Sequence, residues 1–421
     1  MNNLNYVLIK PVLVFCICFF VTIKSAAQDS PGNFIKDAKT GCTVWFKHIF
    51  SEDSVTWDGG CTNSMANGMG TMKGFTKGVN TSTYVGMMLD GKPHGEGTFT
   101  FSDQRKLSGN FSNGEPLFLN EKCLKLLKKH VMSTTDPIEL YDGDNAAKEL
   151  YYHAIIPEGN IKGALVLFPG TWETTEHVVS SNRQLCELVV DNQMAVIVPS
   201  LNQRLTLNDT VLSLINSVLK HAVTTYNIAS DKLVFGGLSM GGLFSLRYTE
   251  MSFQFPEKTA IRPAAVFSVD GPCDLEFIYE KFTLKLRNFP NNGEAKYGIA
   301  EMKKYCGGSP QEAQSRYRYF SCYSHLDPEG GNAKYLLNTP VRIYCDVDPV
   351  WWMENRGLHM YYLNALDQTA MIQLLNDKGN ENAQFINALQ KGYRLEGNRH
   401  PHSWSIVDPA ECVKWIKDAI R

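Results

Sequence analysis

The sequence predicts an α/β fold with a mostly parallel, doubly wound sheet, preceded by a small all-β module. Apolar runs typical of buried strands alternate with helical segments between residues 149 and 421, which favours the parallel sheet. A glycine-rich turn joins one of these strands to a helix within residues 231–248. Glycine-rich repeats within residues 41–118 indicate the separate β module.

The stretch 231–248, DKLVFGGLSMGGLFSLRY, contains the chemistry-bearing motif. Its centre, Gly237-Leu-Ser239-Met240-Gly241, fits the pattern G-x-S-x-G between a strand-forming run and a helical run. Glycines are needed because so sharp a turn leaves no room for a Cβ on either side of the serine. The turn presents the hydroxyl of Ser239 and leaves the N–H of Met240 free to bind an oxyanion.

With its flanking strand and helix, this motif resembles the nucleophile elbow of the α/β-hydrolases, and residues from about 149 to the C-terminus are similar to that family. The resemblance implies a triad whose members follow the chain order serine, acid, histidine. It also implies an acyl-enzyme mechanism that needs no metal and no cofactor.

The resemblance implies that the loop after an early strand supplies a second oxyanion donor. The apolar run 164–168, ALVLF, fits that strand and continues into Pro169-Gly-Thr171-Trp172. Proline has no N–H to offer. We therefore expect the backbone N–H of Thr171 to act together with that of Met240, with Trp172 as the alternative to Thr171.

The triad acid of the family follows a later strand, for which the run 341–345, VRIYC, is the best match. The family pattern puts the acid in a tight turn three positions after a small residue, and Cys345 stands where a glycine is common. This places Asp348 in the acid position. Asp346 is the second choice, and Asp270, which follows the strand 264–269, is the third.

The triad base is expected in the loop before the last helix, residues 409–420, where His400 and His402 both qualify. His402 precedes Ser403-Trp404, which is similar to the H-x-W pattern that often contains the catalytic histidine of the family. His400 precedes a proline and is biased towards an extended turn. We therefore expect His402 to be the base and His400 to support it or contact substrate.

The hydrophobic periodicity of the rest of the chain predicts further strands and helices. Strands are expected at 150–156, 195–198 and 264–269, and helices at 176–192, 209–226, 352–377 and 409–420. Residues 382–390 are a further helix candidate. The stretch 273–338 breaks the period and is expected to form a helical cap over the active site. Residues 119–148 are expected to form a linker whose helix spans 121–132.

The predicted N-terminal module contains an internal repeat in which an aromatic or apolar residue lies two positions before a glycine. Gly59 and Gly68 are nine residues apart, as are Gly86 and Gly95, and each later glycine opens a G-x-G. The units read as stacked β-hairpins, with glycines at turns of positive φ and at close backbone approaches. They resemble MORN-type repeats. The module is expected to dock a partner or the hydrolase domain itself.

Residues 1–28 have the pattern of a secretory signal peptide. An apolar run of 13 residues, 11–23, follows Lys10, and Ser25-Ala-Ala27 provides the small residues that cleavage near residue 27 requires. The chain is therefore expected to be secreted or exported to a bacterial periplasm, with no membrane span left after cleavage. In an oxidising compartment, Cys42 with Cys61 and Cys306 with Cys322 are both candidate local disulfides, neither of which the sequence establishes.

The net charge of −2 gives no electrostatic case for nucleic-acid binding. The sequence as a whole predicts a secreted serine hydrolase that cleaves a carboxylic ester with a Ser239–His402–Asp348 triad. Its acyl substrate is a small molecule, a glycan or a peptide; acylated glycans are suggested only by analogy. The alternatives are a serine peptidase of the same fold and an inactive hydrolase-fold binding protein.

Overall fold

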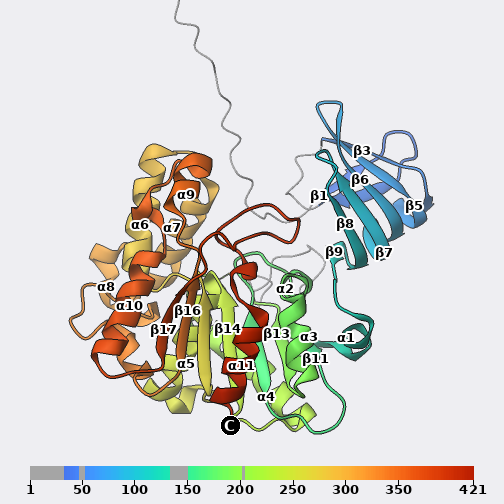
Figure 1. Cartoon of the computed structure of the whole chain (residues 1–421). Helices are drawn as coiled ribbons and strands as arrows, with labels where there is room; N and C mark the ends of the chain where they lie inside the picture. The colour runs from blue at the N-terminus through green and yellow to red at the C-terminus, as the bar shows by residue number, and fades with distance from the viewer. Residues whose placement is uncertain (1–32, 47–52, 133–149, 202–203) are drawn as a thin grey trace, which may run out of the picture.

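The computed structural model describes residues 33–46, 53–132, 150–201 and 204–421. Within these residues the chain forms two separate sheets, a smaller N-terminal one and a larger one flanked by helices (Figure 1). The signal peptide predicted at residues 1–28 lies outside the described residues. Among the helices that are described, none is long and apolar enough to span a membrane.

The larger unit is built on an eight-stranded sheet. Its strands are β10 (Leu127–Val131), β11 (Tyr151–Ile155), β12 (Ala164–Phe168), β13 (Ala195–Pro199), β14 (Leu233–Leu238), β15 (Ala265–Val269), β16 (Val341–Cys345) and β17 (Ala383–Asn387). They lie in the order β10-β11-β13-β12-β14-β15-β16-β17. The two pairings made by β11 are antiparallel, and those from β13 to β17 are parallel. The predicted mostly parallel α/β sheet is thus confirmed.

Helices cover both faces of this sheet, which explains why its inner strands are continuous apolar runs. The flanking helices are α1 (Glu121–Leu126), α2 (Thr175–Ser181), α3 (Arg183–Asp191), α4 (Asp209–Tyr226), α5 (Met240–Gln254), α10 (Ala365–Asp377) and α11 (Pro409–Ala419). Alternate residues of β12 enter different cores. Ala164, Val166 and Phe168 pack with α4, α5 and α10, whereas Leu165 and Leu167 pack with α3 and α11.

The stretch 273–338, predicted as a helical cap, is mostly helical. It contains α6 (Leu275–Asn288), α7 (Gly293–Cys306), α8 (Pro310–Phe320) and the 3-10 helix η3 (Gly331–Leu336). Asn292 caps α7 by accepting the N–H of Ala295 at 2.9 Å, and a capping box of Ser309 and Glu312 opens α8. Frequent caps and turns within a short span account for the irregular pattern seen in the sequence.

Two predicted helices are wrong because strand pairing overrides local pattern. The expected helix at 121–132 ends at Leu126, and the next five residues form β10, which pairs with β11 from Leu127↔Ile155 to Val131↔Tyr151. The candidate helix at 382–390 is instead β17, an edge strand that pairs with β16. In both cases the partner strand is distant in sequence.

Two other predicted helices are interrupted. The helix expected at 176–192 is divided between α2 and α3 at Asn182, whose φ of −106° is not helical. The helix expected at 352–377 is α9 (Pro349–Arg356), the 3-10 helix η4 (Met360–Tyr362) and then α10. Gly357 ends α9 with φ 64°, a left-handed conformation that glycine adopts without strain.

The N-terminal sheet is all β. Its strands are β1 (Asn33–Lys36), β2 (Thr43–Phe46), β3 (Ser54–Trp57), β4 (Gly60–Thr62), β5 (Met65–Thr76), β6 (Val79–Leu89), β7 (Lys92–Phe101), β8 (Lys106–Ser112) and β9 (Glu115–Pro116). The main order is β1-β2-β5-β6-β7-β8-β9, and successive long strands pair as antiparallel hairpins. The identification with MORN-type repeats stays a prediction.

The repeated glycines of this sheet act in the two ways expected from the sequence. Gly91 has φ 78° in the turn between β6 and β7, whereas Gly95, with φ 64°, lies inside β7, near the register shift in the pairing of β6 with β7, and is not at a turn. Gly86 and Gly97 lie against the buried ring of Tyr84, where an added Cβ would come within 2.5 Å and 2.3 Å of the tyrosine hydroxyl, respectively. Gly70 lies against Trp57 in the same manner, because a Cβ added there would come within 2.5 Å of the indole ring. Each aromatic ring therefore fills the space that the missing side chains leave.

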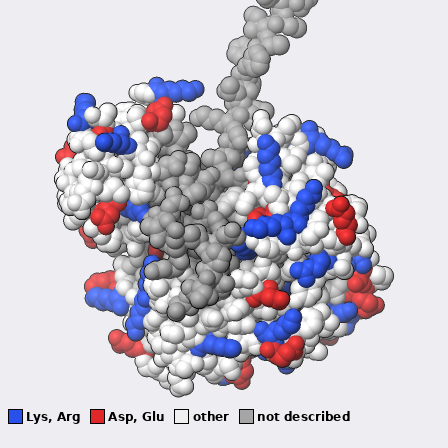
Figure 2. Space-filling view, turned by 180° about the vertical axis from the view of Figure 1, so that it is seen from behind, with Lys and Arg blue, Asp and Glu red and all other residues white. Residues whose placement is uncertain are grey.

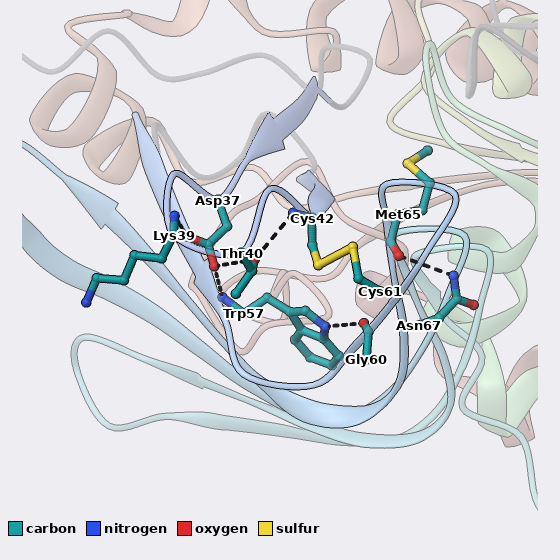
Figure 3. Close-up of a disulfide and its surroundings, with 9 residues drawn as sticks. All are labelled: Asp37, Lys39, Thr40, Cys42, Trp57, Gly60, Cys61, Met65 and Asn67. Atoms are coloured by element: carbon teal, nitrogen blue, oxygen red, sulfur yellow. Dashed lines mark hydrogen bonds between the residues drawn. A yellow bond between two sulfur atoms is a disulfide. The ribbon is translucent and has the colours of Figure 1, made fainter.

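A disulfide joins Cys42 to Cys61 beside the buried ring of Trp57, whose indole N–H donates to the carbonyl of Gly60 at 2.7 Å (Figure 3). The other candidate pair is not formed. Cys306 and Cys322 are both buried free thiols, and the Cys322 Sγ lies 3.4 Å from the carbonyl oxygen of Leu243 on α5.

Hydrogen bonds connect the two units. The N–H of Phe118 donates to Ser180 Oγ at 2.9 Å, and this hydroxyl donates to the carbonyl of Pro116 at 2.6 Å. The Arg105 guanidinium donates to the carbonyl of Glu396, in the hairpin at 393–399. Viewed from the side opposite to Figure 1, basic and acidic side chains are interspersed over the surface (Figure 2).

We expect Gly97→Ala to destabilise the N-terminal sheet, because the added methyl would overlap the buried ring of Tyr84. Overpacking of this kind typically costs about 1–3 kcal/mol of unfolding free energy. Glu96→Ala, at an exposed position of the same strand, is the matched control. Calorimetric unfolding measures the difference; equal transition temperatures for the two variants would contradict the packing argument.

Candidate active site

Ser239 lies at the turn between β14 and α5 in a strained backbone conformation. Its φ of 55° and ψ of −121° are rare for a residue with a side chain. The turn holds because its amide donates to the carbonyl of Val269 at 2.9 Å and its carbonyl accepts the N–H of Gly242 at 2.9 Å. Such strain at a serine between a strand and a helix is the geometry of a nucleophile elbow.

The glycines around Ser239 are required by close backbone packing. A Cβ at Gly237 would lie 2.1 Å from the backbone of Gly241, and a Cβ at Gly241 would lie 2.1 Å from the carbonyl oxygen of Phe168. Neither position tolerates a side chain without movement of backbone atoms. The expectation that this turn excludes a Cβ on both sides of the serine is therefore confirmed.

The elbow lies where the strand order of the sheet reverses. From β12 the chain passes to β13 on one side and then to β14 on the other, so β12 is the switch point. In open α/β sheets, ligands bind at the carboxyl ends of the strands beside such a point. The loop after β12, residues 169–174, and the elbow after β14 share this edge.

Met240 is the first residue of α5, and its amide belongs to the first turn, where helix N–H groups have no partner within the helix. Across the edge, the N–H groups of Thr171 and Trp172 make no hydrogen bond with any residue in the described part of the chain. The ring of Trp172, whose φ is 64°, contacts that of Tyr297 on α7 at a centroid distance of 4.9 Å. These amides are the backbone donors available near the serine.

His402 contacts Asp270. Its Nδ1 lies 2.6 Å from Asp270 Oδ2, and the His402 and Asp270 side chains are 22% and 9% exposed. A carboxylate in hydrogen-bond contact with Nδ1 fixes the imidazole in one orientation and leaves Nε2 as the free nitrogen. This histidine–carboxylate pair joins residues 132 positions apart in the sequence.

Asp270 is itself held by neighbouring side chains. Its Oδ1 lies 3.4 Å from Cys345 Sγ and accepts from Gln368 Nε2 at 3.4 Å, while Asn364 Nδ2 donates to its carbonyl at 2.8 Å. Gln368 Nε2 also donates to the carbonyl of Gly271 at 2.9 Å. Residues of β16 and α10 thus orient the carboxylate towards His402.

Asp270 and Ser239 come from neighbouring strand ends. The hydrogen bond from the Ser239 amide reaches Val269, the residue before Asp270, and a Cβ at Gly271 would lie 2.7 Å from the Ser239 carbonyl oxygen. The backbone on both sides of Asp270 is therefore packed against the elbow, and the same carboxylate binds His402. These contacts place Asp270 beside the elbow and against His402, whereas no hydrogen bond joins the Ser239 side chain to His402 within the described residues.

Asp348 does not contact His402, contrary to our expectation. Its Oδ1 accepts the N–H of Trp351 at 3.0 Å and caps α9, and its Oδ2 accepts from Arg399 Nη2 at 2.9 Å. Asp346, the second choice, lies 2.9 Å from the same guanidinium. The physical reason is charge pairing: Arg399 attracts both carboxylates that follow β16, which leaves the imidazole to Asp270.

Asp346 also anchors the backbone that leads to His402. Its two oxygens accept the N–H groups of Gln390 and Gly392 at 2.9 Å and 2.8 Å. Together with Arg399 it holds the base of the hairpin at 393–399. The carboxylates after β16 therefore position the segment that contains the histidine, instead of pairing with the histidine itself.

Asp270 is only the third choice from the sequence, although a signal for it is present. It follows the apolar strand β15, which comes directly after the elbow strand, and it precedes a glycine. A carboxylate after either β15 or β16 satisfies the order serine, acid, histidine. Nothing in local sequence says which of the two strand ends lies nearer the histidine loop.

His400 lies behind His402 in an aromatic environment. Its ring contacts those of Trp351 and Trp352 at 5.1 Å and 5.5 Å, and its Nδ1 accepts the backbone N–H of His402 at 3.2 Å. Burial, reinforced by the nearby charge of Arg394, lowers the pKa of His400 to about 2. A neutral His400 can accept this hydrogen bond, so it supports the His402 backbone.

A cavity of about 220 Å³ lies on the far side of the histidine loop, between α2 and the hairpin at 393–399. Its lining includes His177, Arg394 and Trp404, but not Ser239. It is therefore separate from the sheet edge that carries Ser239 and the His402–Asp270 pair.

The depressed pKa of His400 predicts that acid weakens the fold. The unfolded histidine takes up a proton below its ordinary value of 6.5, whereas the folded one stays neutral down to about 2. The unfolding free energy should therefore fall as the pH drops below 6.5, by at most about 1.4 kcal/mol per pH unit from this group. Urea unfolding of the protein and of His400→Gln between pH 7.5 and 4.5 measures this, and the variant should show the shallower slope. An unchanged slope would show that His400 is not the source.

No protein-family model matches the chain, and no curated protein sequence matches it. Solved structures similar to the chain include esterases and serine hydrolases.

Three of these structures illustrate the degree of likeness. MPT51 of Mycobacterium tuberculosis is 15% identical, with a TM-score of 0.41 and coverage of 70% of this chain and 98% of its own. An esterase from the fungus Rhizomucor miehei is 15% identical, with a TM-score of 0.44 and coverage of 70% and 83%. Carboxyl esterase 2 of Tuber melanosporum is 14% identical, with a TM-score of 0.43 and coverage of 70% and 87%.

Proposed function

We propose that the protein is a serine hydrolase that cleaves carboxylic esters through an acyl-enzyme on Ser239, with His402 as the base and Asp270 as the triad acid. The observation that supports this most strongly is the 2.6 Å contact between His402 Nδ1 and Asp270 Oδ2, next to a serine in a strained strand-to-helix turn. The acid in this proposal is Asp270, in place of the Asp348 expected from the sequence.

In the acylation step, Ser239 Oγ attacks the carbonyl carbon of the ester while His402 Nε2 takes the hydroxyl proton. The carboxylate of Asp270 stabilises the imidazolium that forms. When the tetrahedral intermediate collapses, the ester C–O bond breaks and the departing alkoxide receives the proton from His402. The products of this step are an alcohol and an acyl group bound to Ser239.

In the deacylation step, a water molecule takes the place of the alcohol. His402 removes a proton from the water as its oxygen attacks the acyl carbon, and then returns the proton to Ser239 Oγ as the acyl bond breaks. A carboxylic acid leaves and the enzyme is regenerated. Both steps use the same three side chains.

The negative oxygen of each tetrahedral intermediate is stabilised by backbone N–H groups. We assign this role to Met240, at the start of α5, and to Thr171, in the loop after β12. Donors of this kind are typically worth a factor of about 10²–10³ in rate each. The N-terminal end of α5 adds a favourable electrostatic potential for the developing charge.

We favour ester hydrolysis over peptide hydrolysis because an ester substrate needs no charged side chain to hold a free peptide terminus. A peptidase that trims short peptides requires a charged side chain to hold a free terminus. Arg318 in the cap, which is a candidate for such a role, lies 3.3 Å from Glu276 and is paired with it. Acylated glycans are one substrate class that we propose to test.

The proposal includes export and a supporting role for the N-terminal sheet. Export rests on the signal-peptide pattern of residues 1–28. The supporting role rests on the hydrogen bonds from Phe118 to Ser180 and from Arg105 to Glu396, which place the sheet beside α2 and the hairpin at 393–399. We assign it no ligand of its own.

A fluorophosphonate probe should label the protein and fail to label Ser239→Ala, because only an activated serine hydroxyl attacks the phosphorus. Hydrolysis of 4-nitrophenyl acetate should fall to the background rate in the same variant. A panel of acetylated and feruloylated sugars, nitrophenyl esters and aminoacyl amides then separates esterase from peptidase activity. Absence of labelling in the unaltered protein would instead support an inactive, binding-only protein.

Replacing the two candidate acids distinguishes their roles. Asp270→Asn should lower kcat for 4-nitrophenyl acetate on the order of 10³–10⁴-fold, since the amide no longer stabilises the imidazolium. Asp348→Asn should retain kcat to within about tenfold, because this carboxylate contacts Arg399 and the start of α9 instead. The reverse order of effects would reassign the triad acid to Asp348.

A further inference from the structure

Glu173 is a buried carboxylate at the junction of the two loops that serve Ser239. It lies in the loop after β12 and directly precedes Thr174, the N-cap of α2. Its side chain is almost completely shielded, with 4% of the residue exposed. A buried carboxylate is costly unless hydrogen bonds compensate for the lost hydration, so its partners indicate what it does.

On one side, Glu173 closes the loop after β12. Its Oε2 accepts the N–H of Gly170 at 2.7 Å, and its own N–H donates to the carbonyl of Gly170 at 3.1 Å. The amide of Gly170 is thereby engaged and is not available to an oxyanion. The turn leaves the N–H groups of Thr171 and Trp172 as the donors of this loop.

On the other side, Glu173 binds the histidine loop. The indole N–H of Trp404 donates to its Oε1 and Oε2 at 3.2 Å and 3.1 Å. Trp404 is 3% exposed and stands two residues after His402. The contact spans 231 positions of the sequence and directly connects the two loops.

A third group lies close to this carboxylate. His177, one helical turn further along α2, has its Nε2 3.8 Å from Glu173 Oε1, and both side chains are buried. The carboxylate is thus surrounded by a backbone amide, an indole N–H and an imidazole. Two of these three groups belong to its own loop and to α2, whereas the indole of Trp404 ties it to a distant part of the chain.

We propose that Glu173 is a positioning residue that holds the loop of Thr171 and the loop of His402 in a fixed relation around Ser239. The inference rests on the proposed function, because that function assigns the oxyanion donor to the loop of Thr171 and the base to the loop of His402. Both loops must be correctly placed in the same transition state, and a misplacement of about 1 Å can cost about 10²-fold in rate. A rigid hydrogen-bonded link between the loops prevents such drift.

The consequence is confined to the chemical step. Glu173 is buried and does not extend from the loop amides towards solvent, so its loss should affect the alignment of donors and base more than substrate affinity. We therefore expect Glu173→Gln to lower kcat for 4-nitrophenyl acetate about 10–100-fold, while KM changes by less than about threefold. Trp404→Phe, which keeps the ring and removes the donor, should have a similar effect.

A double-mutant cycle tests the link itself. If Glu173 and Trp404 act through their mutual hydrogen bonds, the double variant should be no slower than the slower single variant. If the two single-variant losses of kcat multiply in the double variant, as expected of independent residues, the proposal is overturned. Concentrations of active enzyme are taken from fluorophosphonate titration, so that a misfolded fraction does not count as a loss of kcat.

Glu176→Gln is the matched control. This carboxylate is also buried, lies on α2, and contacts Thr175 at 2.8 Å and His153 at 4.0 Å instead of either loop. The Glu176→Gln variant should be less stable than the unaltered protein, but its kcat should stay within about twofold. An equal loss of kcat in Glu176→Gln, or an unchanged kcat in Glu173→Gln, would assign Glu173 a merely structural role.

The proposed function and this inference fail in different ways. An unaltered protein that neither reacts with the probe nor hydrolyses any ester overturns both. An unaltered protein that is active, beside a Glu173→Gln variant of equal kcat, overturns only the positioning role.

Discussion

The close approach of α5 to the loop after β12 is the constraint on which the candidate site depends. A side chain at Gly241 would overlap the carbonyl oxygen of Phe168, and one at Gly237 would overlap the backbone of Gly241. Strand, helix and loop therefore occupy one small volume at the point where the strand order reverses. Ser239 is held in a strained conformation by this packing, and its hydroxyl shares the edge with the first amides of α5. The N-terminal sheet uses the same principle, since its glycines make room for a buried aromatic ring.

Buried carboxylates organise the chain around this edge, and each has a different partner. Asp270 binds the imidazole of His402. Asp346 accepts two backbone N–H groups and pairs with Arg399, which fixes the hairpin leading to the histidine. Glu173 binds the indole of Trp404 on the other side of the same loop. A carboxylate buried in protein needs such donors, so the positions of the donors decide which acid serves which loop.

Local sequence was sufficient where structure depends on neighbours in the chain. The strand at 164–168, the strand at 341–345 and the helix at 209–226 have the bounds that were predicted. Burial on both faces makes a strand a continuous apolar run, and a helix shows its period and its cap within a few residues. The elbow could also be predicted from local sequence, because its glycines, its serine and its flanking strand and helix are contiguous in the chain. Where an element needed a distant partner, as at 127–131 and 383–387, the predicted helices were wrong.

By itself the sequence determined the mostly parallel α/β class, the strands of the larger sheet other than β10 and β17, and the strand-to-helix turn at Ser239. The tertiary structure alone decided which carboxylate meets the imidazole. Three aspartates follow apolar strands and satisfy the same chain order, so periodicity and motif do not separate them. Their roles depend on where the guanidinium of Arg399 lies after folding, since it pairs with both acids behind β16. A side-chain contact between residues 132 positions apart leaves no local pattern, which is why Asp270 emerged only from the folded chain.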